Sequence, residues 1–560
     1  MNAPTLAAAT GETARLARYP SGVPSQIDPD ATPSLHALLL DACVRHAERP
    51  AFDFLGAVMT YAEWERTSAA FAGFLRETLR RPAGERVAIM LPNVLAYPVA
   101  FLGTLRAGLT VVGVNPLYTP RELVHQLVDS GATTIVIMEN FAHKLAGVIS
   151  ETPVEHVVVV RLGEFVPALK RWAFNFANTY LRHAVPAWRF DRFTMMQEAC
   201  ARPPSRALPD PTTIPAAPAL LQYTGGTTGV AKGAMLSHRN LIANTLQCAA
   251  WIGPTVAQGL ERVLTPLPLY HIFSLTANML TFASIGGMNV LIPDPRDIRR
   301  LIATMRRTRV TAMSGVNTLF NALANAPEFA TLDVSQLKFA IGGGAALQSA
   351  VAERWQALTG VALVEGYGLT EASPVVCINP VLRPKLGTVG LPVPSTEVSV
   401  RDDGGRAVGI GEMGEVWVRG PQVMVGYWGR PEETRNTLTP DGWLQTGDIG
   451  VIDSDGFVKL LDRKKDMIIV SGFKVFPNEV EDVVAQHPGV LEAAAIGVPD
   501  PRSGQAVKLF VVRRDPALDE AALRRYCHGN LTAYKVPRVI EFRDALPKSN
   551  IGKILRKELK

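Results

Sequence analysis

Cysteine, charge and long apolar runs are all scarce in this chain of 560 residues. The five cysteines, Cys43, Cys200, Cys248, Cys377 and Cys527, are scattered and form no Cys-x-x-Cys pair. This arrangement argues against a disulfide framework and a zinc site, and it suits a reducing cytosol. Charged residues make up only 19% of the chain and the net charge is +6. Such a mild excess favours anionic ligands without requiring nucleic acid.

The sequence also shows no pattern typical of a secretory signal or of a membrane-spanning helix. The first 33 residues lack the continuous apolar run of a secretory signal, so we expect a flexible tail there. The uncharged stretches 87–105 and 272–293 are interrupted, the first by Pro92 and Pro98 and the second by Gly286-Gly287. They therefore read as buried strands or helices with a turn. We expect a cytoplasmic protein with no transmembrane helix.

What the chain does contain is a long alternation of helical patterns and short apolar runs. Four such runs lie between residues 86 and 160 and four more between 287 and 368, which predicts an α/β fold with two successive doubly wound sheets. Short alternating segments after about Gly387 predict a small antiparallel β subdomain. Residues 465–560 predict a small α+β domain. We therefore expect a tail over 1–33, a body over 34–464 and a C-terminal domain over 465–560.

The strongest local motif is a glycine- and threonine-rich loop followed by a lysine. Its residues are Thr224, Gly225, Gly226, Thr227, Thr228, Gly229 and Lys232. Close backbone N–H groups, hydroxyls and one cation form a cradle for a polyphosphate, whereas a plain hairpin turn rarely combines them. The Walker A pattern is excluded because Ala231 and Gly233 flank the lysine, and because apolar segments on both sides predict strand, loop and strand.

Further segments combine glycine with polar or aromatic side chains, although each alone has a plain structural interpretation. VEGYGLTEASP offers an aromatic ring that can stack on a base, a hydroxyl, and a carboxylate for Mg²⁺, but a surface turn is an equal alternative. IGGGAAL follows a strand and would let a flat ligand approach the backbone. Asp448 in GWLQTGDIG can accept bonds from ribose hydroxyls, or simply form an Asx-turn. LPKSNIGK near the C-terminus is a basic segment of the kind that is usually solvated.

The order of these motifs along the chain indicates a resemblance to a known family that no single motif would indicate. The phosphate loop, PLPLYHIFSL, GGGAAL, GYGLTE, GEVWVRG, TGD, DRKKDMIIVSGFKVFP and PKSNIGK follow one another as in the adenylate-forming superfamily of acyl-CoA synthetases, luciferases and peptide-synthetase adenylation domains. Within it, the chain resembles the bacterial long-chain fatty-acid:CoA ligases from about Ser34 onward. The resemblance implies a two-step reaction. ATP and a carboxylate give an acyl-adenylate and pyrophosphate, and the thiol of coenzyme A then displaces AMP.

The resemblance also implies where ATP and Mg²⁺ bind. The loop from Thr224 to Gly229 and Lys232 would hold the β- and γ-phosphates, and Thr370 would contact the α-phosphate. Glu371 would hold Mg²⁺, with Thr224 as a second metal contact. The remaining nucleotide contacts are the adenine walls and the ribose site, namely Gly343, Gly344, Ala345, Gly366, Tyr367, Gly368, Asp448 and Arg463.

Catalysis and coenzyme A binding are assigned in the same way. Lys553 would stabilise the negative charge that develops at the α-phosphate during adenylation. His271 would orient the fatty-acid carboxylate, with a packed core histidine as the alternative. In the superfamily, the C-terminal domain rotates about a hinge residue, which corresponds to Lys465 here. The rotation removes the lysine that corresponds to Lys553 from the active site and brings in the face of the domain that binds coenzyme A. That face corresponds to Ser471, Gly472 and Lys474.

Two basic segments lie outside these motifs. Residues 165–190 carry four Lys or Arg, no acid and several aromatic residues, and their helical pattern fits either a membrane-surface helix that contacts anionic lipid or a core-facing helix with a solvated basic side. Residues 296–309 carry six Arg and read as a solvated helix or an anion site. The sequence between Gly409 and Gly414 fits Gly-x-Gly-x-x-Gly, but a strand follows instead of a helix, which argues against a dinucleotide site.

Three classes of function remain open from the sequence. The first is an ATP-dependent fatty-acid:CoA ligase. The second is a related enzyme that activates another carboxylic acid or transfers the acyl group to a carrier-protein thiol. The third is a non-enzymatic lipid-binding protein, against which the joint presence of Lys232, Glu371, Asp448 and Lys553 argues. No nucleic-acid partner is expected, and a homodimer stays open.

Overall fold

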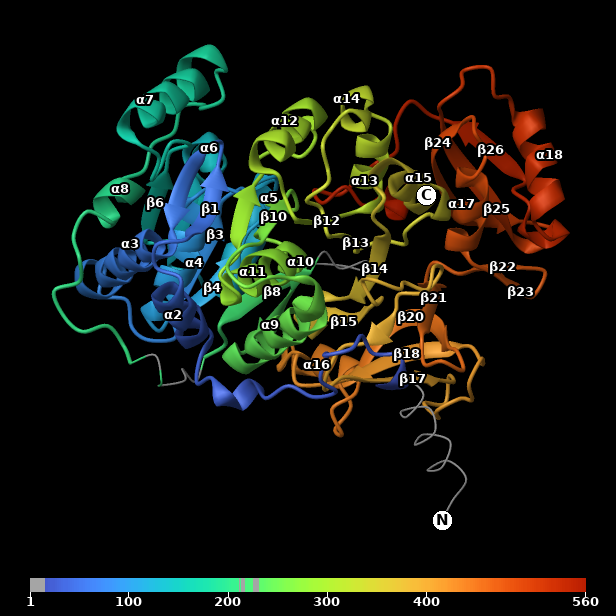
Figure 1. Cartoon of the computed structure of the whole chain (residues 1–560), viewed down its shortest axis with the longest axis horizontal. Helices are drawn as coiled ribbons and strands as arrows, with labels where there is room; N and C mark the ends of the chain where they lie inside the picture. The colour runs from blue at the N-terminus through green and yellow to red at the C-terminus, as the bar shows by residue number, and fades with distance from the viewer. Residues whose placement is uncertain (1–15, 211, 213–216, 225–230, 560) are drawn as a thin grey trace.

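The computed structural model describes residues 16–210, 212, 217–224 and 231–559. Two large mixed sheets form the body, a four-stranded β subdomain lies beneath them in Figure 1, and a C-terminal α+β domain lies to the right. The α/β fold class predicted from the apolar runs is confirmed.

The first large sheet has eight strands in the order β19-β9-β8-β4-β3-β5-β6-β7. Its centre is parallel, and alternate residues of β3 pack into different cores: Val87 and Ile89 into one, Ala88 and Met90 into the other. This burial on both faces explains the continuous apolar runs. The strands are β3 (Arg86–Met90), β4 (Thr110–Gly113), β5 (Thr134–Met138), β6 (His156–Val160), β7 (Phe193–Met195), β8 (Leu220–Thr224), β9 (Lys232–Leu236) and β19 (Gly426–Tyr427).

The second large sheet has nine strands in the order β16-β15-β14-β13-β12-β10-β11-β1-β2. The sequence predicts two sheets formed one after the other along the chain, but the β1–β2 hairpin departs from this order. It lies in the first half of the chain, yet β1 pairs in parallel with β11 and so joins the second sheet. The strands are β1 (Pro50–Phe54), β2 (Ala57–Thr60), β10 (Arg262–Thr265), β11 (Met288–Leu291), β12 (Ala312–Gly315), β13 (Phe339–Gly342), β14 (Leu363–Gly368), β15 (Val375–Ile378) and β16 (Leu391–Pro392).

Helices cover the faces of both sheets. Apolar residues of α5 and α6 pack on one face of the first sheet, and those of α12, α13 and α15 pack on the second. In the body the helices are α2 (Leu35–Arg45), α3 (Tyr61–Gly73), α4 (Ala96–Arg106), α5 (Pro120–Ser130), α6 (Glu139–Ala146), α7 (Ala168–Phe176), α8 (Met196–Ala199), α9 (His238–Ile252), α10 (Ile272–Ser274), α11 (Thr281–Ser284), α12 (Ile298–Thr308), α13 (Asn317–Ala324), α14 (Pro327–Ala330), α15 (Ser349–Thr359) and α16 (Pro431–Thr437).

The β subdomain has the strand order β17-β18-β20-β21 and fits the short alternating segments of the sequence. A strand, not a helix, begins at Gly414, as the sequence pattern predicts. Its strands are β17 (Glu397–Arg401), β18 (Gly414–Arg419), β20 (Leu444–Ile452) and β21 (Val458–Arg463).

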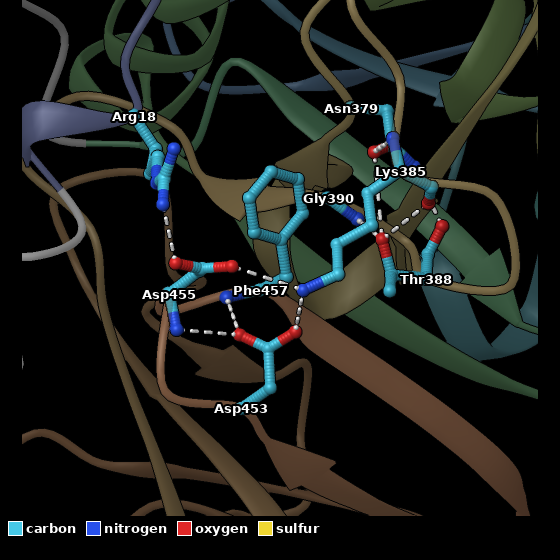
Figure 2. Close-up of polar contacts among 8 residues, drawn as sticks. All are labelled: Arg18, Asn379, Lys385, Thr388, Gly390, Asp453, Asp455 and Phe457. Carbon is cyan, nitrogen blue, oxygen red and sulfur yellow. Dashed lines mark hydrogen bonds and ion pairs between the residues drawn. The ribbon is translucent and has the colours of Figure 1, made fainter.

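The segment before Ser34 contacts this part of the body (Figure 2). Arg18 forms an ion pair of 2.7 Å with Asp455, which also lies 3.2 Å from the Lys385 ammonium. The same ammonium lies 2.6 Å from Asp453. The Tyr19 hydroxyl donates a hydrogen bond to the carbonyl of Pro392. Residues 16–33, expected as part of a tail, therefore have defined contacts in the described structure.

The C-terminal domain packs α17 (Pro477–Ala485) and α18 (Glu520–Asn530) on a sheet that contains β22 (Ile468–Val470), β23 (Phe473–Val475), β24 (Val490–Asp500), β25 (Gly504–Arg513) and β26 (Val539–Phe542). Its own apolar core matches the predicted small domain. Across the described residues of the whole chain, no helix combines the length and the apolar character needed to cross a membrane.

Candidate active site

The phosphate loop joins two antiparallel strands. Thr224 ends β8, Lys232 begins β9, and the two residues are paired across the hairpin. This is the strand–loop–strand arrangement predicted from the flanking apolar segments. The residues between them, Gly225, Gly226, Thr227, Thr228 and Gly229, lie outside the described part of the chain.

A tyrosine from a distant segment links the predicted phosphate and metal residues. Strand β19 pairs with β9, which brings Tyr427 beside the hairpin. The Lys232 ammonium lies 5.5 Å from the centre of the Tyr427 ring, and the Tyr427 hydroxyl donates a 2.7 Å hydrogen bond to Glu371. Lys232 also lies 3.9 Å from Glu433. The fold thus brings Lys232 and Glu371 into one neighbourhood, which sequence spacing alone could not establish.

The predicted adenine walls come from two neighbouring parallel strands. β13 ends at Gly342, which is paired with Glu365 of β14, so Gly343 lies beside Gly366, and Gly344 and Ala345 continue the loop. A Cβ atom placed on Gly343 would lie 3.1 Å from the Phe273 ring and 3.2 Å from the carbonyl oxygen of Gly366. Open sheets bind ligands outside the carboxyl ends of their strands, and these glycines lie at that edge.

The predicted ribose residue is held by two side chains. Asp448 and Arg463 are paired on β20 and β21, and the Arg463 guanidinium lies 2.7 Å from one carboxylate oxygen of Asp448. The Tyr367 hydroxyl donates a 2.5 Å hydrogen bond to the other oxygen. Asp448 is almost fully buried. Both partners orient its carboxylate, and each oxygen keeps a lone pair for a further donor.

Lys553 reaches this group from the far end of the chain. Burial, with the nearby charge of Arg463, lowers the pKa of Lys553 to about 8, and the charge of Asp448 opposes that shift. Burial, with the charge of Lys553, lowers the pKa of His271 to about 4. His271 is therefore neutral at pH 7, and its Nδ1 accepts a hydrogen bond from the backbone N–H of Phe273. The remaining ring nitrogen, Nε2, then carries the proton and can donate.

Two family models match most of the chain, and Asp448 and Arg463 lie between the two matched ranges. The model described as AMP-binding enzyme matches residues 39–428, and the model described as AMP-binding enzyme C-terminal domain matches residues 479–553. The chain belongs to the AMP-binding enzyme family. The resemblance drawn from the motif order is therefore confirmed at the level of the family.

Individual members of the family are similar over their full length. The long-chain-fatty-acid–CoA ligase of Salmonella typhimurium is 53% identical over 546 residues, which covers 97% of each chain. The protein of the same name from Escherichia coli O157:H7 is 52% identical, again over 97% of each chain. Among solved structures, the anthranilate CoA ligase AuaEII in complex with anthranoyl-AMP has a TM-score of 0.83 at 26% identity, with 95% of this chain and 98% of that chain covered.

Other predicted site residues of this AMP-binding enzyme lie apart from Lys553. Ser471 and Gly472 form the exposed turn between β22 and β23, with φ values of 51° and 85°, and Lys474 follows on β23. Figure 1 shows this hairpin at the outer edge of the C-terminal domain, away from α10, which begins directly after His271. The predicted hinge residue Lys465 lies between β21 and β22. The predicted coenzyme A residues and Lys553 thus do not meet in this arrangement.

The donor set fits Mg²⁺ held mainly by substrate phosphates. In the described residues no cluster of three or more His, Cys, Asp or Glu side chains could hold a metal ion. Mg²⁺ typically binds through one or two carboxylates together with phosphate oxygens and water. Glu371 supplies such a carboxylate on the short helix after β14, with Thr370 beside it, while Thr224 ends β8.

Sequence reasoning missed several residues that the fold brings to the site. Tyr427 contacts Glu371, and the amide of Asn550 donates a 3.1 Å hydrogen bond to the Tyr270 hydroxyl. Glu365 lies in the middle of β14, where burial raises its pKa to about 8. A charged residue in an apolar parallel strand could have pointed to Glu365. Tyr427 carried no comparable signal, because its role depends on a strand pairing.

Proposed function

We propose that this AMP-binding enzyme is a long-chain fatty-acid:CoA ligase that performs two half-reactions in one site. The observation that supports this most directly is the position of Lys553, whose half-buried ammonium group lies within electrostatic reach of Arg463, Asp448 and His271. The high identity to ligases named for long-chain fatty acids supports the substrate class.

In the first half-reaction, a fatty-acid carboxylate oxygen attacks the α-phosphorus of ATP. The bond to the β-phosphate breaks and pyrophosphate leaves. The Nε2–H of neutral His271 orients the carboxylate, which is already ionised at pH 7 and needs no base. The Lys553 ammonium stabilises the charge that develops at the α-phosphate, without transferring its proton.

The nucleotide is held by the residues around this centre. The loop from Thr224 to Gly229 and Lys232 hold the β- and γ-phosphates, and Thr370 contacts the α-phosphate. Asp448, oriented by Arg463, accepts hydrogen bonds from the ribose hydroxyls. Glu371 and Thr224 would hold Mg²⁺, which neutralises phosphate charge when bound.

In the second half-reaction, the sulfur of coenzyme A attacks the acyl carbonyl, the thiol proton is released, and AMP leaves. The exposed Ser471–Gly472 turn and Lys474 must reach the site for this step, and rotation of residues 465–560 at Lys465 would bring them there. One site thus serves both reactions, with different faces of the C-terminal domain.

A panel of fatty acids from C4 to C18 tests the function. Pyrophosphate release is measured with and without coenzyme A, and the thioester product is quantified. We expect fatty-acid-dependent pyrophosphate and an equal yield of acyl-CoA, greatest for long chains. Pyrophosphate without acyl-CoA would contradict the ligase, and no fatty-acid-dependent pyrophosphate would contradict adenylation itself.

We further infer that α7 contacts an anionic membrane surface from which fatty acid is taken up. The aromatic face of α7 and of the helical turn that follows it is exposed, with Trp172 and Tyr180 each 65% accessible and Leu169 82% accessible. This exposure argues against a core-facing role for these side chains, although Phe174 on the same helix packs against Phe54 of the core. The Trp172 and Phe176 rings stack, and Tyr180 in the helical turn after α7 packs on Phe176 at a tilt of 38°. Figure 1 shows α7 projecting from the body. Residues 165–190 contain basic residues and no acidic residue, so the positive charge of this segment complements anionic headgroups.

Flotation with anionic vesicles tests this contact. Trp172→Ala should float less than the parent protein, because it removes a large apolar side chain from the interface. Leu382→Ala serves as the control, since Leu382 is 73% accessible, comparable with Trp172, but lies on a different part of the body. Equal flotation of both variants and the parent would contradict a role for α7.

A further inference from the structure

The loop that forms one adenine wall leads directly into α15, and side chains from three elements hold that junction. Helix N-termini leave backbone N–H groups without partners inside the helix. Here three successive N–H groups each have a side-chain acceptor. They are Leu347 to Glu365 at 3.2 Å, Gln348 to Asn317 at 3.1 Å, and Ser349 to Asp482 at 3.0 Å.

One of these acceptors belongs to the C-terminal domain. Asp482 lies on α17, and the same carboxylate oxygen also accepts a 2.8 Å hydrogen bond from the Ser349 hydroxyl. A carboxylate at this end of α15 is also favoured by the helix dipole. Glu365 and Asn317, in contrast, lie on β14 and α13 of the body. If the C-terminal domain turns away, the junction loses Asp482 but keeps the other two.

The same orientation of the domain also places Lys553. The Thr318 hydroxyl on α13 donates a 2.9 Å hydrogen bond to the carbonyl of Gly552, which precedes Lys553. The Asn321 amide donates a 3.0 Å bond to the carbonyl of Leu491. Helices α13 and α15 thus form the surface on which the C-terminal domain rests while Lys553 faces the site.

We propose that Asp482 is a positioning residue that couples the orientation of the C-terminal domain to the adenine wall. When Lys553 faces the active site, Asp482 anchors the start of α15 and so fixes the preceding Gly343–Gly344–Ala345 loop for ATP. When the domain turns for thioester formation, this anchor is released and AMP is held less tightly. The inference rests on the proposed two-step function and adds a route by which domain rotation favours product release.

The half-reactions of Asp482→Ala test this coupling. We expect the KM for ATP in adenylation to rise about tenfold, with a smaller change in kcat, because the wall loses an anchor while Lys553 is retained. Thioester formation from supplied acyl-adenylate should keep the parent rate. Asp482→Asn, which keeps an acceptor oxygen, should restore much of the ATP affinity, and Ser349→Ala should raise the KM in the same direction.

Asp519→Ala is the matched control. Asp519 caps α18 within the C-terminal domain by accepting a hydrogen bond from the Ala522 N–H at 2.7 Å, but it makes this contact without crossing to the body. Asp519→Ala should leave the KM for ATP unchanged, and its thermal midpoint should be comparable with that of Asp482→Ala. An unchanged KM in Asp482→Ala, equal KM changes in both variants, or equal loss of both half-reactions would overturn the coupling. Failure of the parent protein to form acyl-adenylate would instead overturn the proposed function.

Discussion

The charge of Lys553 depends on its surroundings more than that of an ordinary lysine. Burial disfavours the ammonium form, and the neighbouring Arg463 adds to this effect, so the pKa falls to about 8. Asp448 acts in the opposite direction but is already paired with Arg463. A weakly hydrated ammonium in this position is well suited to receive a phosphate group.

Replacement of this lysine should separate the two half-reactions. We expect Lys553→Ala to slow adenylation by roughly 10²–10³-fold, because one preorganised electrostatic contact is lost. Thioester formation from supplied acyl-adenylate should continue. Pyrophosphate release and single-turnover acyl-CoA formation measure the two steps. Lys557→Ala, an exposed lysine on the same segment, is the control, and equal loss of both steps in Lys553→Ala would refute its specific role.

The pH dependence of adenylation should report the same lysine. The ammonium form is required and is lost as pH rises through the pKa, so kcat/KM for adenylation should fall above about pH 8, approaching tenfold per pH unit. His271, with a pKa of about 4, should add no limb between pH 6 and 8. Lys553→Arg should be slower but lack the alkaline limb. A limb that persists in this variant would assign it to another group.

At the scale of elements, the end of β14 shows that similar glycines have different physical roles. A Cβ atom on Gly368 would lie only 2.1 Å from the backbone oxygen of Pro374, where β14 shifts register against β15. A Cβ atom on Gly366 would find its nearest neighbours at 3.6 Å, an ordinary contact. Gly368 is therefore required by backbone packing, whereas Gly366, in the segment predicted to wall the adenine, has room for one more carbon atom.

Alanine at these two positions should give opposite phenotypes. We expect Gly368→Ala to lower the free energy of unfolding by about 3 kcal/mol, because a backbone atom cannot move aside easily. Gly366→Ala should keep the parent thermal midpoint but raise the KM for ATP. Thermal unfolding and ATP-dependent adenylation measure the two effects. A stable Gly368→Ala variant would show that the β14–β15 register can adjust.

At the scale of the molecule, the chain closes on itself through contacts between its N-terminal segment and residues more than 200 positions away. Tyr19 packs edge-on against Trp251, with ring centres 5.1 Å apart, and bonds to Pro392. Arg18 reaches Asp455 beside the Lys385 ammonium (Figure 2). The tyrosine contact is partly buried, while the arginine contact is exposed to solvent.

This difference in exposure predicts a difference in stability. We expect Tyr19→Ala to lower the free energy of unfolding by about 2 kcal/mol, from one aromatic contact and one hydrogen bond. Arg18→Ala should cost less than about 1 kcal/mol, because exposed ion pairs contribute little and are screened by salt. Thermal unfolding of both variants at low and high salt measures this. An Arg18→Ala effect as large as that of Tyr19→Ala would contradict the ranking.

The sequence alone determined the element types and the family of this protein. Apolar runs such as those around Val87 and Val158 are local patterns, and their burial on both faces follows from a parallel sheet. The order of the short motifs can also be recognised without any knowledge of distances. The glycine, threonine and lysine residues of the phosphate loop indicate phosphate chemistry from their identity and spacing in the sequence.

Only the tertiary structure decided which distant residues meet. Tyr427 joins Lys232 and Glu371 because a two-residue strand pairs with β9, and no local pattern specifies that pairing. Asp482 reaches α15 because the C-terminal domain takes one orientation, and its sequence context reads as an ordinary amphipathic helix. Local interactions fix helices, strands and turns, whereas contacts between segments far apart in sequence depend on how the whole chain packs.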